Sequence, residues 1–512
     1  MQMGWIHFLL LTTSLLIAAS ADAESTTILS VNAQGEAANG GSDRPAISSD
    51  GRFVAYQSSA SDLVSGDTNN QNDIFLQELR TNTVTRISLG VNGTQSNSGS
   101  TSPAISQDGR HVAFESMATN LVANDTSGSQ DIFVHDRMTA TTVRVSVGAN
   151  GVAANSHCLH PAISGDGRFV VYVSAANNLT GDDTNTVTDV FLHDRDPDQN
   201  SVFDENNGTT TRISPSGAAA AGSNSNFPSI SRNGQYVAYS SFDATLVSSD
   251  SNSRQDIFVY TMQSGVTERV SIANGGQQGD GESTFTSLSD DGRYVAFISA
   301  ATNLVSGDTN SSTDVFVRDR TVGTTVRASV SNSGAQSGSS STNPVISGDG
   351  RYVSFAIESA ALTAKLIGEE VAPVVLFDAV TAATGGGGGG GTSIPLVIYR
   401  RDLNQQKTVR VSSNNSGASA NGTSTSLAIS ADGMVAAFAS SAANLGCATD
   451  SNAASDVFVR DMNITTSALC GTPSGSNRAK SGGSGALLIW MIVVLLILHV
   501  FFRYLSLRFT RP

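Results

Sequence analysis

The stretch from Asp194 to Glu205 spaces oxygen-bearing side chains in the manner of a calcium-binding loop. It reads DRDPDQNSVFDE and places Asp194, Asp196, Asp198 and Asn200 at positions 1, 3, 5 and 7, with Glu205 at position 12. EF-hand-type loops use this spacing because hard oxygen donors surround one Ca²⁺ ion and the final glutamate binds it with both oxygens. Position 7 of such loops contributes its backbone carbonyl, so Asn200 is expected to bind in that way. The spacing predicts a structural calcium site and no catalytic residue.

Two features of the same loop favour another interpretation. Position 6 is Gln199, where calcium loops need glycine for a sharp turn, and Pro197 is unusual at position 4. The flanking segments have strand character, so the helix–loop–helix unit is absent. The alternative is a solvated acidic turn that binds no ion.

A repeated motif determines where this loop lies. Successive copies are separated by 58, 58, 67, 58, 58 and 83 residues, and internal repeats of this kind indicate one structural unit per copy. The seven copies are PAISSDGRFVAY from Pro45, PAISQDGRHVAF from Pro103, PAISGDGRFVVY from Pro161, PSISRNGQYVAY from Pro228, TSLSDDGRYVAF from Thr286, PVISGDGRYVSF from Pro344 and LAISADGMVAAF from Leu427.

Each repeat contains four candidate strands, which predicts a propeller blade. PAIS is followed by an Asp-Gly turn and by an alternating segment such as RFVAYQS, and DIFVHD-like and TTVRVS-like segments complete the unit. We therefore expect an all-β fold, a seven-bladed β-propeller of four-stranded antiparallel blades over residues 24–472. The segment ILSVNAQG from Ile28 aligns 58 residues before RISLGVNG from Arg86, so a spare N-terminal strand is expected to fasten the first blade to the last.

Two insertions interrupt the repeat. The acidic loop is a ten-residue excess in the third repeat, within residues 195–208, between the third and fourth strands at a blade rim. The sixth repeat carries an insertion over 357–396 with seven consecutive glycines, Gly385 to Gly391. No Lys-Ser/Thr follows these glycines, so they predict a surface loop and not a phosphate-binding loop.

Other polar residues recur at fixed repeat positions. The aspartates of the GDTN-like loops are candidates for weak metal contacts or for turns closed by their own side chains. His135 and His193 share one variable position and are expected to decorate the rim. His157, Cys158 and His160 have a nonstandard spacing for a metal. The fourth-strand arginines are expected to brace strands within blades. The loop aspartates in question are Asp67, Asp125, Asp183 and Asp308, and the arginines are Arg86, Arg144, Arg212, Arg269, Arg327 and Arg410.

Both ends of the chain carry apolar segments. Residues 1–23 read as a signal peptide, and 486–502 as a transmembrane or sorting helix that follows a Ser/Gly linker at 473–485. Arg503, Arg508 and Arg511 in residues 503–512 predict a cytoplasmic tail. Export permits a disulfide between Cys447 and Cys470, with Cys158 free, or three free thiols. A net charge of −15 with three lysines argues against nucleic acid as a partner.

The repeat ISxDGRYVAF…DIFVRD…TTRVS resembles the TolB-type propeller repeats of exported bacterial proteins, from about Ile28 to Cys470. The order SGGSG, apolar helix and arginine-bearing end is similar to GlyGly-type C-terminal sorting segments. That resemblance implies cleavage by a rhomboid-type intramembrane protease and transfer to the surface, and the alternative is a plain membrane anchor.

Together these features predict an exported, periplasmic or cell-surface propeller. We expect a non-enzymatic binding or scaffold module of the bacterial envelope with a protein or glycan ligand, because no compact catalytic set emerges from near-equivalent blades. The alternative is a propeller hydrolase or lyase that acts on peptides or polysaccharide from a central channel.

Overall fold

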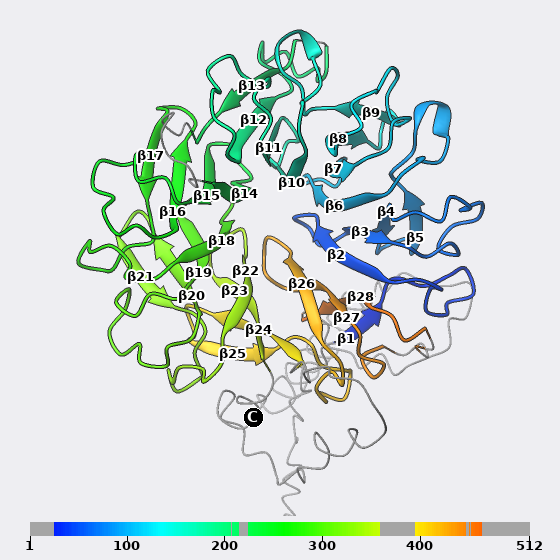
Figure 1. Ribbon diagram of the computed structural model, residues 1–512. Helices are drawn as coiled ribbons and strands as arrows, with labels where there is room; N and C mark the ends of the chain where they lie inside the picture. The colour runs from blue at the N-terminus through cyan, green and yellow to red at the C-terminus, as the bar shows by residue number, and fades with distance from the viewer. Residues whose placement is uncertain are drawn as a thin grey trace, which may run out of the picture. The chain divides into compact units, whose positions relative to one another are not determined.

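The computed structural model describes residues 25–205, 207–214, 224–358, 395–446, 450 and 452–462. Contacts divide the chain into Met1–Leu469 and Cys470–Pro512, and the description below concerns the first unit alone. It contains seven four-stranded sheets, each antiparallel, arranged in chain order around a central axis (Figure 1). The predicted seven-bladed propeller is confirmed.

The first blade shows how the repeat folds. Its strands are β2 (Ser42–Ile47), β3 (Phe53–Ser58), β4 (Asp73–Glu78) and β5 (Thr83–Arg86), in that order from the axis outward. The turn between β2 and β3 needs Gly51, whose φ of 68° is costly for other residues. The middle strands are buried on both faces because neighbouring blades cover them, which explains their apolar composition.

The next five blades repeat this order. Blade two holds β6 (Ser100–Ile105), β7 (His111–Ser116), β8 (Asp131–Asp136) and β9 (Thr141–Arg144); blade three β10 (Cys158–Ile163), β11 (Phe169–Ser174), β12 (Asp189–Asp194) and β13 (Thr209–Arg212); blade four β14 (Ser225–Ile230), β15 (Tyr236–Ser241), β16 (Asp256–Thr261) and β17 (Val266–Arg269); blade five β18 (Ser283–Leu288), β19 (Tyr294–Ser299), β20 (Asp314–Asp319) and β21 (Thr324–Arg327); blade six β22 (Ser341–Ile346), β23 (Tyr352–Glu358), β24 (Leu396–Asp402) and β25 (Lys407–Arg410). Short 3₁₀ turns, η1 (Val91–Gly93) and η2 (Ala149–Gly151), follow β5 and β9.

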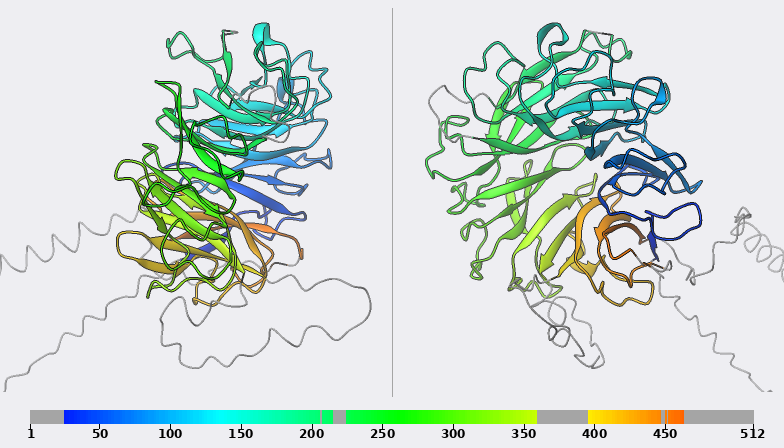
Figure 2. Two further views of the ribbon diagram at one scale, coloured as in Figure 1. Left: turned by 60° about the vertical axis from the view of Figure 1, so that its left-hand side comes forward. Right: turned by 45° about the vertical axis from the view of Figure 1, so that its right-hand side comes forward.

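The seventh blade, called the closing blade below, joins the two ends of the propeller. It consists of β26 (Ser424–Ile429), β27 (Val435–Ser440), β28 (Asp456–Asp461) and, outermost, β1 (Ser25–Ile28). Strand β1 pairs antiparallel with β28, so Ile28 lies opposite Phe458. The expected N-terminal fastening strand is therefore present, and the blue and orange segments meet in both views of Figure 2.

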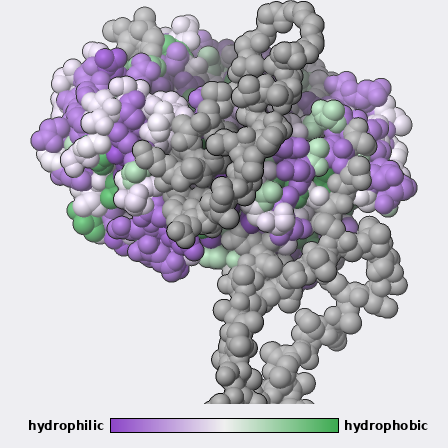
Figure 3. All heavy atoms as spheres, turned by 90° about the horizontal axis from the view of Figure 1, so that it is seen from below, coloured by the Kyte–Doolittle hydropathy of each residue, from purple (hydrophilic) through white to green (hydrophobic). Residues whose placement is uncertain are grey.

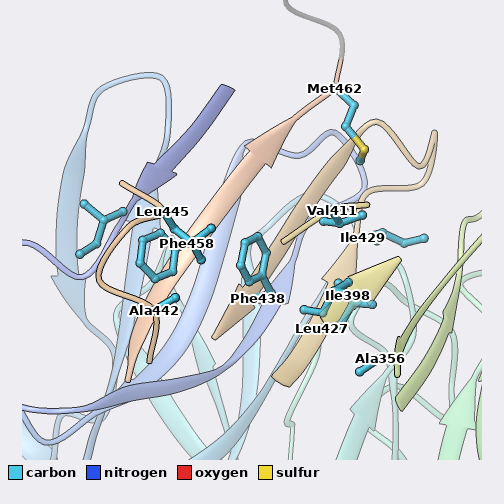
Figure 4. Packing of buried hydrophobic residues seen from close by; sticks show 12 residues of the cluster. Ala356, Ile398, Val411, Leu427, Ile429, Phe438, Ala442, Leu445, Phe458 and Met462 are labelled. Atoms are coloured by element: carbon cyan, nitrogen blue, oxygen red, sulfur yellow. The ribbon is translucent and has the colours of Figure 1, made fainter. Parts of the chain in front are cut away.

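Apolar side chains between adjacent sheets form the core. In the closing blade, Phe438 and Phe458 stack 5.8 Å apart and pack with Leu427, Ile429 and Leu445 (Figure 4). Equivalent aromatic pairs recur in the other blades. The surface of the propeller is polar in contrast to this core, since hydrophilic residues cover most of the coloured surface in Figure 3.

Backbone hydrogen bonds between the inner turns also tie the blades together. The turns after β2, β6, β10, β14, β18, β22 and β26 each donate an N–H to a carbonyl of a neighbouring turn, which closes a belt around the axis. The bonds are Ser49 to Gln107 (3.1 Å), Gln107 to Gly165 (2.9 Å), Gly165 to Arg232 (2.8 Å), Asn233 to Asp290 (3.1 Å), Asp290 to Gly348 (2.9 Å), Asp349 to Ala431 (3.4 Å) and Ala431 to Ser49 (3.0 Å).

Several predictions fall outside the described residues. These are the signal peptide at 1–23, most of the sixth-repeat insertion, Cys447 and Cys470, and all segments from 473 to the end. Strand β23 ends at Glu358 and strand β24 begins at Leu396. The sixth-repeat insertion therefore lies between these two residues and is slightly shorter than the predicted 357–396. Across the described part of the chain, no helix has the length and apolar character needed to cross a membrane.

Candidate functional site in the central channel

Asp194 is part of the repeat and not of the acidic loop alone. Its carboxylate accepts two hydrogen bonds from Arg168, Nε to Oδ1 at 2.7 Å and Nη2 to Oδ2 at 2.6 Å. The same pair joins Arg110 to Asp136 in blade two, where no insertion exists. The structure thus directs the first predicted calcium ligand toward an arginine.

The remaining predicted ligands lie on the turn after β12, where Asp196 is buried and Asp198, Asn200 and Glu205 are exposed. Asp196 accepts the backbone N–H groups of Asn200 and Ser201, each at 3.0 Å. Asn200 Nδ2 donates to Asp198 Oδ2 at 3.1 Å and to Glu205 Oε2 at 2.6 Å. The Asn200 amide thus joins Asp198 to Glu205, whereas Asp196 is held by backbone N–H groups. The described ranges contain no cluster of three or more His, Cys, Asp or Glu side chains placed to hold a metal. Calcium binding here stays a prediction.

The insertion packs against blade two. Arg195 is buried and donates from Nη1 to the Gly167 carbonyl at 2.6 Å and from Nε to Asp204 Oδ1 at 2.9 Å. Its guanidinium lies 4.9 Å above the ring of Phe203, which in turn lies 5.4 Å from His111. Burial, together with the charge of Arg195, lowers the pKa of His111 to about 4. The insertion therefore acts as a strap between two blades.

The loop aspartates are partners of the fourth-strand arginines. We call this arrangement the arginine clamp: one guanidinium between two aspartates of its own blade. The predicted turn closure is present at Asp125 and Asp183, whose Oδ1 atoms accept the backbone N–H groups of Ser127 at 3.1 Å and Asn185 at 3.2 Å. The arginine is a further partner of these aspartates, and the predicted bracing role of the arginines in blades one to five is confirmed. In each clamp the arginine Nη1 lies near one loop aspartate and one third-strand aspartate. The distances are, for Arg86, 3.0 Å to Asp67 and 3.5 Å to Asp73; for Arg144, 2.7 Å to Asp125 and 3.5 Å to Asp131; for Arg212, 3.1 Å to Asp183 and 3.2 Å to Asp189; for Arg269, 3.0 Å to Asp250 and 3.2 Å to Asp256; and for Arg327, 3.0 Å to Asp308 and 3.2 Å to Asp314.

The histidines predicted to decorate the rim are buried instead. His135 Nδ1 lies 3.0 Å from Thr142 Oγ1, and His193 Nδ1 lies 2.9 Å from Thr210 Oγ1, each beside the fourth strand of its own blade. Burial lowers the pKa of His193 to about 4, so this imidazole is neutral at physiological pH. Both residues serve packing between strands.

The residues of the HCLH segment do not converge on one point. His157 Nδ1 accepts the backbone N–H of Gln130 at 3.0 Å. Burial raises the pKa of the Cys158 thiol to about 12, which keeps it protonated and inert. His160 faces the central channel, where it belongs to a larger set.

Seven equivalent residues line this channel. Every inner strand has a β-bulge, at which the register of its pairing with the next strand shifts. The residue at the bulge has a positive φ between 48° and 55°. Such a conformation costs about 1–2 kcal/mol for a residue other than glycine. We call these residues the channel ring: Arg44, Ser102, His160, Phe227, Phe285, Asn343 and Ser426.

The channel ring surrounds a cavity of about 320 Å³. One arc is aromatic, since the ring centroids of His160 and Phe227 are 5.3 Å apart and those of Phe227 and Phe285 are 4.0 Å apart. The other arc is polar and contains Arg44, which donates from Nη1 to Ser102 Oγ. In Figure 1 the inner strands that carry this ring surround the axis.

Glu115 holds the backbone of the channel ring at His160, where the aromatic arc ends. Its Oε1 accepts the backbone N–H of His160 at 2.6 Å, and its Oε2 accepts from Gln130 Nε2 at 2.7 Å and Thr101 Oγ1 at 3.1 Å. Burial lowers the pKa of the His160 imidazole, Glu115 opposes this shift, and the charge of Arg44 adds to it.

The channel ring had a signal in the sequence. It is the residue directly before the PAIS-like segment, and it changes from blade to blade whereas the residue after it is proline in five of the seven copies. This contrast within each copy is the signal by which the ring could have been found.

No family model matches this chain, and no curated protein matches its sequence. Several solved propellers are similar in fold. TolB from Acinetobacter baumannii is 16% identical over 59% of this chain and 64% of that chain, with a TM-score of 0.31. The propeller domain of the trilobed protease from Pyrococcus furiosus is 12% identical over 82% and 95%, with a TM-score of 0.44. Oligogalacturonate lyase from Vibrio parahaemolyticus is 10% identical over 86% and 91%, with a TM-score of 0.43. These likenesses concern the fold alone.

Proposed function

We propose that this protein is a non-enzymatic binding module whose channel ring holds a protein or glycan ligand. The observation that carries the proposal is the ring itself: seven strained positions bear five different residue types within an otherwise repeated structure. Strained residues persist where the fold holds them for a purpose, and such residues cluster at binding sites. The cavity volume lies at the lower end of the range for ligand pockets, which suits one terminal unit of a ligand.

A hydrolase or lyase is the alternative. Ser102 and His160 are neighbours on the ring, but in the described part of the chain Ser102 is bonded to Arg44 and shares no hydrogen bond with His160. Nucleophilic catalysis needs such a bonded pair of nucleophile and base. Turnover of a peptide or polysaccharide by the purified protein, lost in His160→Ala, would contradict the binding proposal.

We propose further that the module is exported and acts in the bacterial envelope. The support is the sequence of residues 1–23, which is typical of a signal peptide, and the apolar sequence at 486–502 with the arginines that follow it. The helix anchors the protein, or a rhomboid-type protease removes it during sorting to the surface. Fractionation of cells, with mass spectrometry of the C-terminal peptides, distinguishes the anchored form from the cleaved form.

Co-purification from envelope extracts tests the function. Wild-type protein should retain a partner that Phe227→Ala releases, because this substitution opens the aromatic arc. Phe242→Ala is the matched control, since Phe242 is 41% exposed and does not line the channel. Equal retention by both variants would place the ligand outside the channel.

A further inference from the structure

We propose that the channel ring recognises a glycan, and specifically the ring of a neutral pyranose sugar. This inference rests on the proposed binding function and names its ligand class. It is carried by three features of the channel: the loss of a usable strand edge, the aromatic arc and the mixed donors and acceptors of the polar arc.

The first feature disfavours recognition of a peptide backbone. A peptide added to an inner strand would need a regular row of free N–H and C=O groups along the channel edge. Five inner strands instead have proline directly after the ring residue, and proline has no N–H to donate. The bulge interrupts the row again. The five are Pro45, Pro103, Pro161, Pro228 and Pro344. The channel therefore presents side chains rather than a backbone ladder.

The second feature is an apolar arc next to polar groups, in which stacked rings cover both faces of Phe227 and leave its edge to the cavity. Phe227 and Phe285 stack on one another, and His160 extends the row on the other side of Phe227. Both phenyl groups are half-buried and line the cavity. The C–H groups of a pyranose ring pack against such an apolar arc, and its hydroxyl groups then point toward the polar arc.

The third feature supplies partners for those hydroxyl groups. Arg44 donates, Asn343 both donates and accepts, and Ser102 and Ser426 do the same through their hydroxyls. A sugar hydroxyl is itself a donor and an acceptor, so a mixed arc satisfies it better than a purely cationic one.

Local charge favours a neutral sugar over an acidic one. The backbone N–H of Arg44 donates to Asp43 Oδ1 at 2.7 Å, and Glu115 lies behind His160. Two carboxylates thus lie against the backbone of the ring, beside Arg44 and behind His160, in a protein whose net charge is −15. An anionic ligand would meet no net positive field in the channel.

Calorimetry and saturation-transfer NMR on the full-length protein test the inference. The protein is kept in a detergent without a sugar headgroup, and the probes are cellotriose, chitotriose, maltotriose and a trimeric uronic acid. At least one neutral trisaccharide should bind, with saturation transfer strongest at its axial C–H protons. Phe227→Ala and Phe285→Ala should each weaken binding about tenfold, whereas Phe242→Ala should leave it unchanged.

Asn343→Leu gives a second, milder variant if the phenylalanine variants fail to fold. It removes one polar partner at a half-buried position and should weaken binding about fivefold without moving the unfolding midpoint.

The outcomes separate this inference from the proposed function. A protein partner that is lost in Phe227→Ala, with no binding of any trisaccharide at millimolar concentration, overturns the glycan inference and leaves channel binding intact. Preference for the uronic acid overturns the neutral-sugar assignment. Sugar binding that is unchanged in all three ring variants overturns both the glycan inference and channel binding, since the ligand then binds outside the channel.

Discussion

Blades one to five and the closing blade carry aspartates at the same two positions but differ in the residue placed between them. In each of the first five, a fourth-strand arginine lies between two buried aspartates, as Arg327 does between Asp308 and Asp314. In the closing blade the fourth strand is β1, and Ile28 stands where the arginine is expected. Asp450 and Asp456 occupy the two aspartate positions there. One guanidinium is thus exchanged for an apolar side chain at the seam of the propeller.

The exchange favours packing at the expense of charge balance. Ile28 joins the apolar cluster of Phe458 and Leu445, which helps a four-residue strand stay in place. Asp456 keeps the hydrogen bond from Ser30 Oγ at 2.6 Å, and burial together with the charge of Asp450 raises its pKa to about 6. The clamp braces a continuous chain, whereas the seam depends on apolar contacts and on a carboxyl group that titrates near neutral pH.

Removing a clamp should have the largest effect. Arg327→Leu leaves Asp308 and Asp314 buried without their cation, and breaking a buried ion pair in this way costs about 3–5 kcal/mol. Denaturant unfolding monitored by circular dichroism measures the loss. Arg254→Leu is the control, because Arg254 is exposed and a surface change there should stay within about 0.5 kcal/mol. A loss below about 1 kcal/mol for Arg327→Leu would show that the clamp is not structural.

The joint between blades two and three should lose stability in acid. The pKa of His111 is about 4 in the folded protein and 6.5 ordinarily, so between these values the unfolded chain binds the extra proton. The contribution of His111 is complete above pH 6.5 and is lost by pH 4, with a span of about 3 kcal/mol. The charged neighbours in this pocket are Arg195, Arg110, Asp136 and Asp108.

His111→Phe should remove this acid-dependent loss. Blades one and three carry Phe53 and Phe169 at the same position, so phenylalanine fits the site. Unfolding midpoints between pH 4 and pH 7 test the difference from wild type. Identical acid limbs in the two proteins would assign the loss to other groups.

The seam should respond to pH in the opposite direction. Asp456 has a folded pKa of about 6 against an ordinary 3.8, so its ionisation disfavours the folded state. Its contribution to the free energy of unfolding is most favourable below pH 3.8 and is constant above pH 6. Between these two values it falls by about 2–3 kcal/mol. Asp450→Asn removes the neighbouring charge and should stabilise the protein at pH 7 by about 1 kcal/mol.

Asp308→Asn is the matched control for the seam, because it alters the same repeat position inside an arginine clamp. There the lost charge weakens the contact with Arg327, so this variant should be destabilised at pH 7. Equal signs for Asp450→Asn and Asp308→Asn would contradict the distinction between clamp and seam.

The repeat made the architecture predictable. Six Asp-Gly turns and one Asn-Gly turn, each followed by alternating apolar residues, predict both the number of blades and their strand order. The spare strand at Ile28 followed from alignment with Arg86, because a missing partner is visible within a repeat. The repeat does not predict ion pairs between residues far apart in the chain. The sequence around Asp67 indicates a turn, whereas its ion-pair partner is Arg86 on the fourth strand.

The channel ring escaped prediction for a related reason. Its members are about 58 residues apart and differ chemically, so no motif unites Arg44 with Phe227. Only the bulge, which bends each inner strand at the same residue, brings them to one cavity. The calcium spacing was easier to see but incomplete, since it ignored that Asp194 also belongs to the repeat.

The smallest effect is expected from calcium at the insertion of blade three. Because Asp194 is bonded to Arg168 and the Asn200 amide bridges Asp198 and Glu205, an incoming Ca²⁺ ion must displace that amide. We expect weak binding, with a dissociation constant of about 0.1–1 mM. Isothermal titration should show binding that Glu205→Gln abolishes. Asp194→Asn should instead lose stability, and Asp136→Asn should lose a similar amount in blade two, which has the same arginine pair and no insertion. If Asp194→Asn abolishes binding while Asp136→Asn leaves it unchanged, the insertion recruits a repeat residue as its first ligand, and the strap is a calcium loop as its spacing predicts.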